Sequence, residues 1–338
     1  MAMTRRKFTL MAGASLMAGV CLPAKAQGSS APKQNRQISL VLAPSNLGLR
    51  PVGRNQPGTW RAPQTLLDAG LADALGATEV VRLERPDYAF GAQPSTRIRN
   101  GLSIRTFSLH LATRVRAILQ QGGFPVVIGG DCSILLGGLY GSRLAGGRGL
   151  VHVDGHSDFN HSANDHNSTR LGTAAGMDLA LASGRGEALL TSWPEIGSPL
   201  ASDADIVQLG ERESTDPDQD HLPDTAIMQL TAQSMLTIGV QEAARRTIEK
   251  LQARGLDKVW LHVDLDVLDQ TVMPAVDSPG SPGLNYAQLA ELVGELCASG
   301  CIAGVNFAIY DPDRDPTARY AHPLVHCIAD GIRGLTSA

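Results

Sequence analysis

Three short aspartate-rich motifs each follow a run of apolar residues that favour β-structure. They read Gly129-Gly130-Asp131-Cys132-Ser133, Asp154-Gly155-His156-Ser157-Asp158 and Asp264-Leu265-Asp266-Val267-Leu268-Asp269. Polar residues directly after a buried strand lie at its C-terminal end, so a parallel sheet would gather all three motifs at one edge. The alternating spacing of the second motif also projects its three polar side chains toward the same side of an extended segment. Carboxylates and an imidazole gathered in this way favour a site for two divalent metal ions.

Apolar β-rich runs alternate with helix-period stretches along most of the chain. The runs lie at 38–43, 80–83, 125–128, 150–153, 206–209, 226–230, 259–263 and 302–310. The helix-period stretches include 63–75, 108–121, 134–144, 171–182, 241–253 and 286–298. This alternation predicts an α/β fold in which helices cover both faces of a parallel sheet. Since neither a repeat nor a linker divides this body, we expect one domain over residues 38–338.

Composition limits the kinds of partner that the chain can have. Of its 338 residues, 43% are hydrophobic, which is enough for a substantial core. The formal net charge is −4, and the body of the chain contains no long basic run. We therefore expect neither nucleic acid nor an anionic membrane as a partner.

The first 26 residues are typical of an export signal. Thr4-Arg5-Arg6-Lys7-Phe8 carries paired arginines, and the apolar stretch 10–22 that follows is too short and too rich in Gly and Ala to span a membrane. Ala24-Lys25-Ala26 then fits a small-x-small cleavage site. The segment resembles a twin-arginine signal peptide, which predicts cleavage after Ala26, a flexible leader at 27–37 and a periplasmic protein without stable membrane anchoring. The alternative is a basic tail before a membrane anchor.

Taken together, the three motifs resemble those of the arginase/agmatinase (ureohydrolase) family. They come in the family's order, and Pro274-Ala275-Val276-Asp277-Ser278-Pro279 resembles the segment that follows the last metal motif. The resemblance runs from about Ile38 to Asp315. It implies a three-layer α/β/α fold with a mainly parallel sheet of about eight strands, a binuclear manganese site, and a homo-oligomer that is a trimer or a hexamer.

The resemblance also implies a set of metal ligands: Cys132, Asp154, His156, Asp158, Asp264 and Asp266. Two of them, Asp154 and Asp264, would bridge the two ions, and the others would complete one ion or the other. A single Asp after a strand often only caps a helix. Several acids together are different, because carboxylates rarely cluster without a cation to offset their repulsion.

The mechanism that the family implies is attack on a planar carbon by a hydroxide held between the two ions. Asp158 would hold that hydroxide by a hydrogen bond and later pass its proton to the leaving amine. Asp131 and Asp269 would orient the backbone or the metal ligands.

Cys132 is the first departure from the family, which usually has histidine at this position. A divalent ion lowers the pKa of a thiol enough for the thiolate to coordinate it. Thiolate is a softer ligand, however, and it shifts the preference from Mn²⁺ toward Zn²⁺, Fe²⁺ or Co²⁺. The alternative is a buried small residue, with that ion weakly bound or absent.

Ile309 is the second departure, because arginases and agmatinases pair the guanidinium of the substrate with a glutamate at this position. A buried guanidinium without a carboxylate partner is costly. Either the substrate is less cationic, or another acid such as Asp277 or Asp313 replaces the glutamate. Asp277 is equally well read as an ordinary turn residue.

Other substrate contacts are expected from polar loops that follow the strands. Asn160 and His161 lie in the loop after the second motif, and Glu213 lies where the family has acids that contact an amino-acid head group. The third departure is Ala175, since family arginases have a proton-relaying histidine around this point. His161 or His166 is the candidate replacement.

The sequence thus predicts a binuclear metal-dependent hydrolase, an amidinohydrolase that cleaves a C–N bond of a small guanidino, amidino or ureido compound and releases urea or a related product. One alternative is an amide hydrolase on the same scaffold, although related deacetylases have a His-His pair that is missing before the Asp motif here. The other alternative is a non-catalytic periplasmic protein that binds a metal or a ligand. Retention of Asp158, the proposed acid, argues for catalysis.

Overall fold

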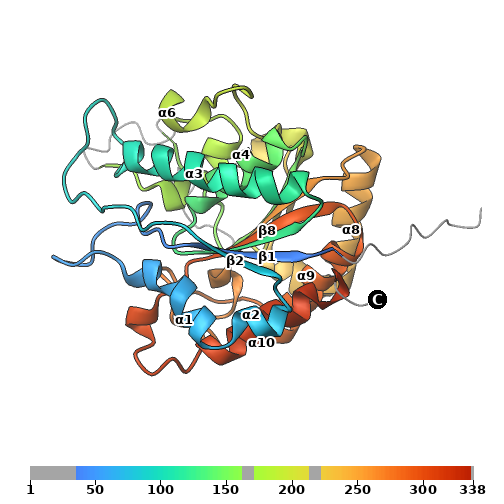
Figure 1. The fold of residues 1–338 in the computed structure, drawn as a ribbon. Helices are drawn as coiled ribbons and strands as arrows, with labels where there is room; N and C mark the ends of the chain where they lie inside the picture. The colour runs from blue at the N-terminus through green and yellow to red at the C-terminus, as the bar shows by residue number, and fades with distance from the viewer. Residues whose placement is uncertain (1–35, 162–170, 213–221, 336–338) are drawn as a thin grey trace, which may run out of the picture. The chain divides into compact units, whose positions relative to one another are not determined.

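An eight-stranded sheet organises the computed structural model shown in Figure 1, which describes residues 36–161, 171–212 and 222–335. The strands are β1 (Ile38–Ala43), β2 (Glu79–Arg82), β3 (Phe124–Gly129), β4 (Leu150–Val153), β5 (Ile206–Leu209), β6 (Met228–Leu230), β7 (Val259–Asp264) and β8 (Ile302–Ala308). Their order across the sheet is β2-β1-β3-β8-β7-β4-β5-β6, and every neighbouring pair is parallel. The predicted sheet is confirmed, and each apolar run of the sequence contributes one strand.

Helices cover both faces of this sheet, which confirms the expected three-layer architecture. They are α1 (Ala62–Asp68), α2 (Leu71–Leu75), α3 (Gly101–Gln120), α4 (Ile134–Leu144), α5 (Asp178–Ala182), α6 (Ala188–Thr191), α7 (Ala232–Ile238), α8 (Val240–Ala253), α9 (Tyr286–Ala298) and α10 (Ala321–Ile332). Figure 1 shows α3 and α4 packed together on one side of the sheet, with α1, α2 and α10 on the other. Helices α9 and α10 pack against each other, and α8 continues that layer beside α9.

The burial of the strands follows their position in the sheet. Strands β1, β3, β4, β5, β7 and β8 are buried along their whole length, as their continuous apolar sequences predict. The edge strands β2 and β6 are only partly buried. The inner strands therefore form a rigid platform for whatever follows their C-terminal ends.

The helices differ from the sequence prediction in several places, and α6 and α7 are among those that were not predicted. The single helix predicted at 63–75 is two helices, because Gly70 between them adopts φ +92, a left-handed conformation that glycine reaches without steric cost. The predicted helix 171–182 is wrong in its first half, where a 3₁₀ turn (Ala174–Met177) with a non-helical Gly176 precedes α5. Helix α10 was not predicted at all.

Strand order explains why the three aspartate motifs meet. Strands β3, β8, β7 and β4 are consecutive neighbours in the sheet, and the motifs directly follow or end β3, β7 and β4. Asp264 at the end of β7 is in register with Ala308, so Ile309 follows at the same edge. The C-terminal ends of four adjacent strands thus form one site, as in other open parallel sheets.

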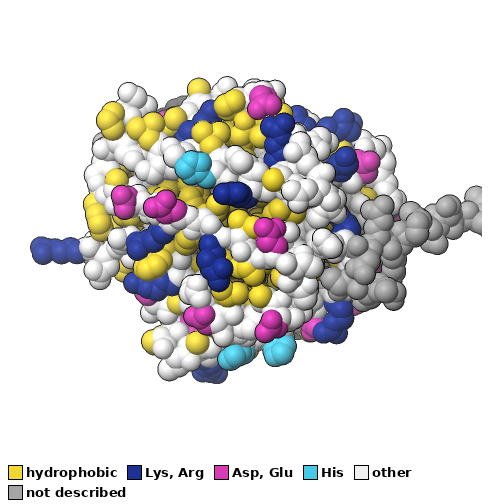
Figure 2. Space-filling model, viewed as in Figure 1, with side chains coloured by type: hydrophobic (Ala, Val, Ile, Leu, Met, Phe, Trp, Pro, Cys, Tyr) yellow, Lys and Arg dark blue, Asp and Glu magenta, His cyan; other side chains and the backbone are white. Residues whose placement is uncertain are grey.

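Some features of the chain concern its surface and its termini. Figure 2 shows acidic and basic side chains interspersed over one face, with hydrophobic side chains between them. Within the described residues, no helix has both the length and the apolar character needed to cross a membrane. Cys132, Cys297, Cys301 and Cys327 are buried and free of disulfides. The predicted signal peptide lies outside the described residues, as does Glu213.

Candidate metal centre

A cavity of about 590 Å³ opens at the C-terminal edge of the sheet, where the three motifs meet. The predicted site residues that line it are Cys132, His156, Asp158, Asn160, Asp264, Asp266 and Asp277. Asp154 is fully buried next to them. His161 is not among the lining residues, and its ring contacts that of Phe159 edge to face. The structure therefore brings all six predicted metal ligands and two of the four predicted substrate residues to one place.

The second and third motifs interlock around His156. Its Nδ1 lies 2.9 Å from Oδ2 of Asp266 and 3.7 Å from Oδ1 of Asp154. The backbone N–H of His156 donates to Asp154 Oδ1 at 2.6 Å, and that of Gly155 donates to Asp266 Oδ1 at 3.1 Å. A Cβ on Gly155 would lie 1.9 Å from the guanidinium of Arg212, so any other residue here would require that side chain to shift. One nitrogen and two carboxylate oxygens within 4.8 Å of one another form the first donor cluster.

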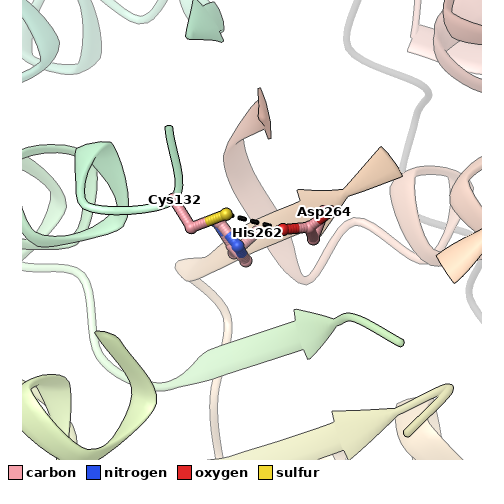
Figure 3. Close-up of side chains that lie close together, drawn as sticks. All are labelled: Cys132, His262 and Asp264. Carbon is pink, nitrogen blue, oxygen red and sulfur yellow. Dashed lines mark hydrogen bonds between the residues drawn. The ribbon is translucent and has the colours of Figure 1, made fainter. Parts of the chain in front are cut away.

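The second donor cluster joins the first and third motifs, as Figure 3 shows. Cys132 precedes α4, and its thiol donates to Oδ2 of Asp264 at 2.6 Å. Asp264 is the last residue of β7, and its other oxygen accepts the backbone N–H of Asp266 at 2.7 Å. His262, also on β7, lies in the same cluster. The structure thus offers a sulfur, a nitrogen and a carboxylate as donors beside the first cluster.

The pKa values of the acids at this site shift in different directions when no cation offsets their charge, and, although burial opposes its charge, hydrogen bonding to His156 lowers the pKa of Asp154 to about 2. Burial, followed by repulsion from neighbouring carboxylates, raises the pKa of Asp158 and of Asp264 well above the usual range. Burial and the Asp264 carboxylate likewise raise the pKa of the Cys132 thiol. Burial opposes the charge of His156, but its hydrogen bonds with Asp154 and Asp266 outweigh burial and raise its pKa to about 11. A divalent cation would reverse the repulsion among these groups.

The donor set fits two divalent ions. Among the described residues, Oδ2 of Asp154 is buried without a hydrogen-bond partner, although its other oxygen accepts the N–H of His156. A buried carboxylate oxygen with no partner is costly unless something binds it. Two adjoining clusters that share this buried edge, with thiolate, imidazole and carboxylate donors, suit transition-metal ions.

Neighbouring side chains decide whether Cys132 or His262 can complete the second cluster. The indole N–H of Trp260 can only donate, and it lies 2.7 Å from Oδ1 of Asn306. The amide nitrogen of Asn306 therefore faces Nδ1 of His262 at 2.7 Å and donates to it. Burial, followed by repulsion from His152, lowers the pKa of His262 to about 3, so the ring is neutral. Its hydrogen is then on Nε2, which leaves no lone pair there for an ion, and the sulfur of Cys132 is the better ligand.

Ile309 stands where the family resemblance predicts a glutamate. Ile309 lines the cavity and adopts φ +76, a left-handed conformation that is rare for a β-branched residue. Its N–H donates to the carbonyl of Gly130 at 2.6 Å. Asp277 lies on the same cavity, with an oxygen 3.8 Å from Arg314. Asp277 and Ile309 therefore line the same cavity.

Three other predicted residues take different places. Asp131 is fully buried and accepts hydrogen bonds from Ser45 Oγ at 2.6 Å and from the N–H of Ser133 at 3.0 Å, which fixes the turn that carries Cys132. Asp269 accepts the N–H and the hydroxyl of Thr271 and so orders its own loop. Asp313 is half exposed, pairs with Arg61 at 2.9 Å and is not among the residues lining the cavity.

Sequence reasoning missed a buried polar network behind the metal centre. Its members are His152, Asp178, Gln208, His262 and Asn306, all fully buried. The available signal was the spacing of His152 and His262, each two residues before an aspartate of a motif and so on the same side of its strand. Asp178 gave no such signal, since it fell inside a predicted helix.

Comparison with known proteins agrees with this geometry. A model of the Arginase family matches residues 36–330. The chain is 28% identical to the arginase of Bacillus caldovelox over 302 residues, covering 86% of this chain and 97% of that protein. It is 26% identical to human Arginase-1 over 292 residues, covering 84% of this chain and 88% of that protein.

Two solved structures share the fold of this chain. The native structure of the Bacillus caldovelox arginase matches with a TM-score of 0.76 and 26% identity, covering 88% of this chain and 98% of that one. A formimidoylglutamase from Bacillus subtilis matches with a TM-score of 0.67 and 19% identity, covering 90% and 88%, and at this identity shares the fold alone.

Proposed function

This chain belongs to the arginase family, and from that premise we propose that it is a metal-dependent amidinohydrolase. Its reaction is hydrolysis of a C–N bond in a small guanidino, amidino or ureido compound, with release of urea or a related product. The observation that carries this proposal is the pair of adjoining donor clusters, one around His156 and one around Cys132, on the wall of a single cavity.

The residues that would hold the two ions are Cys132, Asp154, His156, Asp158, Asp264 and Asp266. When bound, the ions would lower the pKa of a water molecule and so provide the nucleophile at neutral pH. Manganese is expected from the family, whereas the thiolate of Cys132 favours Zn²⁺, Fe²⁺ or Co²⁺.

Asp158 is proposed to move the proton. Its side chain is almost completely buried, yet it reaches the cavity from a backbone with φ +45, a left-handed conformation that Asp tolerates better than most residues. Burial and the surrounding acids raise its pKa, which favours the protonated form of this carboxyl group. It would accept a proton from the nucleophile and donate it to the leaving nitrogen.

The charges of the cavity favour a substrate with one basic and one acidic end. Asp277 is the acid that would pair with a guanidinium or amidinium group, in place of the carboxylate that is missing at Ile309. Arg50 lines the same cavity and is exposed, so it would attract an anionic group at the other end of the substrate. Guanidino acids are therefore preferred over guanidino amines.

The test uses protein purified without chelator. Elemental analysis should find about two ions per chain, and a panel of guanidino acids, guanidino amines and ureido compounds should release urea or ammonia from at least one member. Asp158→Asn should reduce kcat by about 100-fold or more while leaving the fold unchanged. Full activity of this variant would contradict the proposed role. Two ions without turnover on any compound would favour a binding protein instead.

Export and assembly belong to the same proposal. We propose that the twin-arginine segment directs the chain to the periplasm and that the mature protein forms a trimer or hexamer, as the family resemblance implies. Replacing Arg5 and Arg6 by Lys should keep the protein in the cytoplasm on cell fractionation. Light scattering of the mature protein should report the mass of a trimer or a hexamer, and a monomer mass would contradict the assembly.

A further inference from the structure

Two buried imidazole rings lie stacked behind the metal centre. His152 on β4 and His262 on β7 are partners in the register of the sheet, and their ring centroids lie 4.7 Å apart at an interplanar angle of 21°. Each stands two residues before a proposed bridging ligand, Asp154 or Asp264. Neither ring is exposed to solvent, so any hydrogen-bond partner must come from the protein, and within the described residues Nε2 of His262 has none.

Amide side chains fix the hydrogens on both rings. The amide nitrogen of Gln208 donates to the carbonyl of His156 at 2.7 Å, so its oxygen faces Nδ1 of His152 at 2.5 Å. Nδ1 of His152 therefore carries a hydrogen. On the other ring, the Trp260–Asn306 chain described above places the hydrogen of His262 on Nε2. Gln208 thus fixes a hydrogen on Nδ1 of His152, whereas Asn306 makes Nδ1 of His262 a hydrogen-bond acceptor.

Asp178, at the start of α5, lies between the remaining ring nitrogens. Its Oδ1 is 3.1 Å from Nε2 of His152, and its Oδ2 is 3.6 Å from Nε2 of His262. The carboxylate thus faces one imidazole with each oxygen and is itself fully buried. Nε2 of His152 also lies 3.8 Å from Oδ2 of Asp154, the bridging-ligand oxygen that lacks a hydrogen-bond partner within the described part of the chain.

We propose that His152, Asp178 and His262 are positioning residues that hold Asp154 and Asp264 in the geometry needed to bridge two ions. The proposal rests on the proposed binuclear site. A bridging carboxylate must present both oxygens within tenths of an ångström, and residues behind the ligands commonly supply that restraint.

The side chains around the two imidazole rings also keep them from binding the ions in place of Cys132. Nδ1 of His262 accepts the amide N–H of Asn306, and Nε2 of His152 is hydrogen-bonded to Asp178, so neither of these nitrogens has a free lone pair for an ion. Burying three polar groups costs free energy that apolar packing would avoid. That cost is accounted for if the groups orient the metal centre.

Cobalt binding to the full chain provides the test, because it needs no knowledge of the substrate. Wild-type protein should bind two Co²⁺ ions and show a thiolate-to-cobalt charge-transfer band from Cys132. Asp178→Asn and His262→Phe should each lower the affinity for at least one Co²⁺ ion by about 10- to 100-fold and alter the charge-transfer band. His262→Gln, which restores an N–H near the position of Nε2, should recover most of the affinity. If His262 only stabilised the fold, His262→Gln would not recover the cobalt affinity that His262→Phe loses.

Asp205→Asn is the matched control. Asp205 is also a buried aspartate, but it pairs with Arg254 at 2.8 Å away from the cavity. This variant should lower the melting temperature and leave cobalt affinity and spectrum unchanged. If Asp178→Asn and His262→Phe bind both ions with wild-type affinity and spectrum, the positioning role is wrong while the proposed function stands. Fewer than two ions on the wild-type protein would instead overturn the binuclear site itself.

Discussion

The thiol of Cys132 donates to the Oδ2 oxygen of Asp264 across 2.6 Å and so joins the first aspartate motif to the third. In the absence of an ion, this proton satisfies a carboxylate that has neighbouring acids. An ion that binds here must displace the proton, because thiolate and not thiol is the ligand. Metal binding to this protein is therefore coupled to proton release.

Replacing Cys132 should change the metal preference of the protein. Cys132→His restores the ligand type of the family and should raise the affinity for Mn²⁺ relative to Zn²⁺, since imidazole is harder than thiolate. Cys132→Ser should lose most binding at that position and leave about one tightly held ion per chain. Competition titrations with Mn²⁺ and Zn²⁺, followed by elemental analysis, measure both effects.

Cys327→Ser is the control for this comparison. Its thiol is buried on α10 and donates to the carbonyl of Tyr286 at 3.3 Å, a bond that a serine hydroxyl can replace. Metal content and preference should stay at wild-type values in this variant. Unaltered metal preference in Cys132→His would show that position 132 is not a ligand.

Stability of the metal-free protein should fall as pH rises above 6.5. Hydrogen bonds with Asp154 and Asp266 outweigh burial and raise the pKa of His156 from 6.5 to about 11, whereas the contribution of Asp178, whose pKa burial raises to about 7, is lost mostly below pH 7. A group whose pKa is higher in the folded than in the unfolded state stabilises the fold fully when the pH is below its unfolded pKa. This stabilisation is lost as the pH rises from the unfolded pKa through the folded pKa. The lowered pKa of His262, about 3, acts in the opposite direction only below its ordinary value of 6.5.

Melting temperatures with and without chelator at pH 6.5 and 8.5 check this prediction. The metal-free protein should melt lower at pH 8.5 than at pH 6.5. Bound ions replace the protons on the acids and on His156, so the stabilisation by Mn²⁺ or Zn²⁺ should be larger at pH 8.5. A metal-free protein that gains stability over this interval would contradict the protonation states described for the site.

The sheet and the meeting of the three aspartate motifs at one edge were predictable because both depend on local patterns. Apolar runs gave the strands, and parallel strands necessarily bring their C-terminal ends to one edge, so Asp154 and Asp264 were placed together without knowledge of strand order. The break at Gly70 was not predicted, because helical periodicity continues through it and only the backbone angle reveals the end of α1.

The network behind the site was unpredictable for a different reason. Asp178 at the start of α5 faces His152 on β4 and His262 on β7, and no spacing in the sequence encodes these long-range contacts. The tautomer of His262 depends on Trp260 and Asn306 from two strands. Long-range contacts of this kind require the three-dimensional structure.

Asp277→Asn should weaken the binding of a cationic substrate. If Asp277 pairs with the guanidinium, removal of its charge should lower kcat/KM by about 10- to 100-fold, mainly through KM, and metal content should be unchanged. Asp313→Asn is the matched control, because Asp313 lies nearby in the loop after β8 but pairs with Arg61. Equal effects of the two substitutions would rule out a specific role for Asp277.

Ile309→Glu should move the preference of the enzyme toward fully cationic guanidines. The new carboxylate would lie on the cavity wall where the family has its glutamate, and an unbranched side chain also relieves the strain of φ +76. With Asp277 still present, two acids would face one cation, so Ile309→Glu combined with Asp277→Asn should give the clearest gain. Kinetics on a guanidino amine and a ureido compound measure the ratio of kcat/KM. Ile309→Gln has the same shape without the charge, and a similar shift in that variant would mean that charge at position 309 does not set specificity.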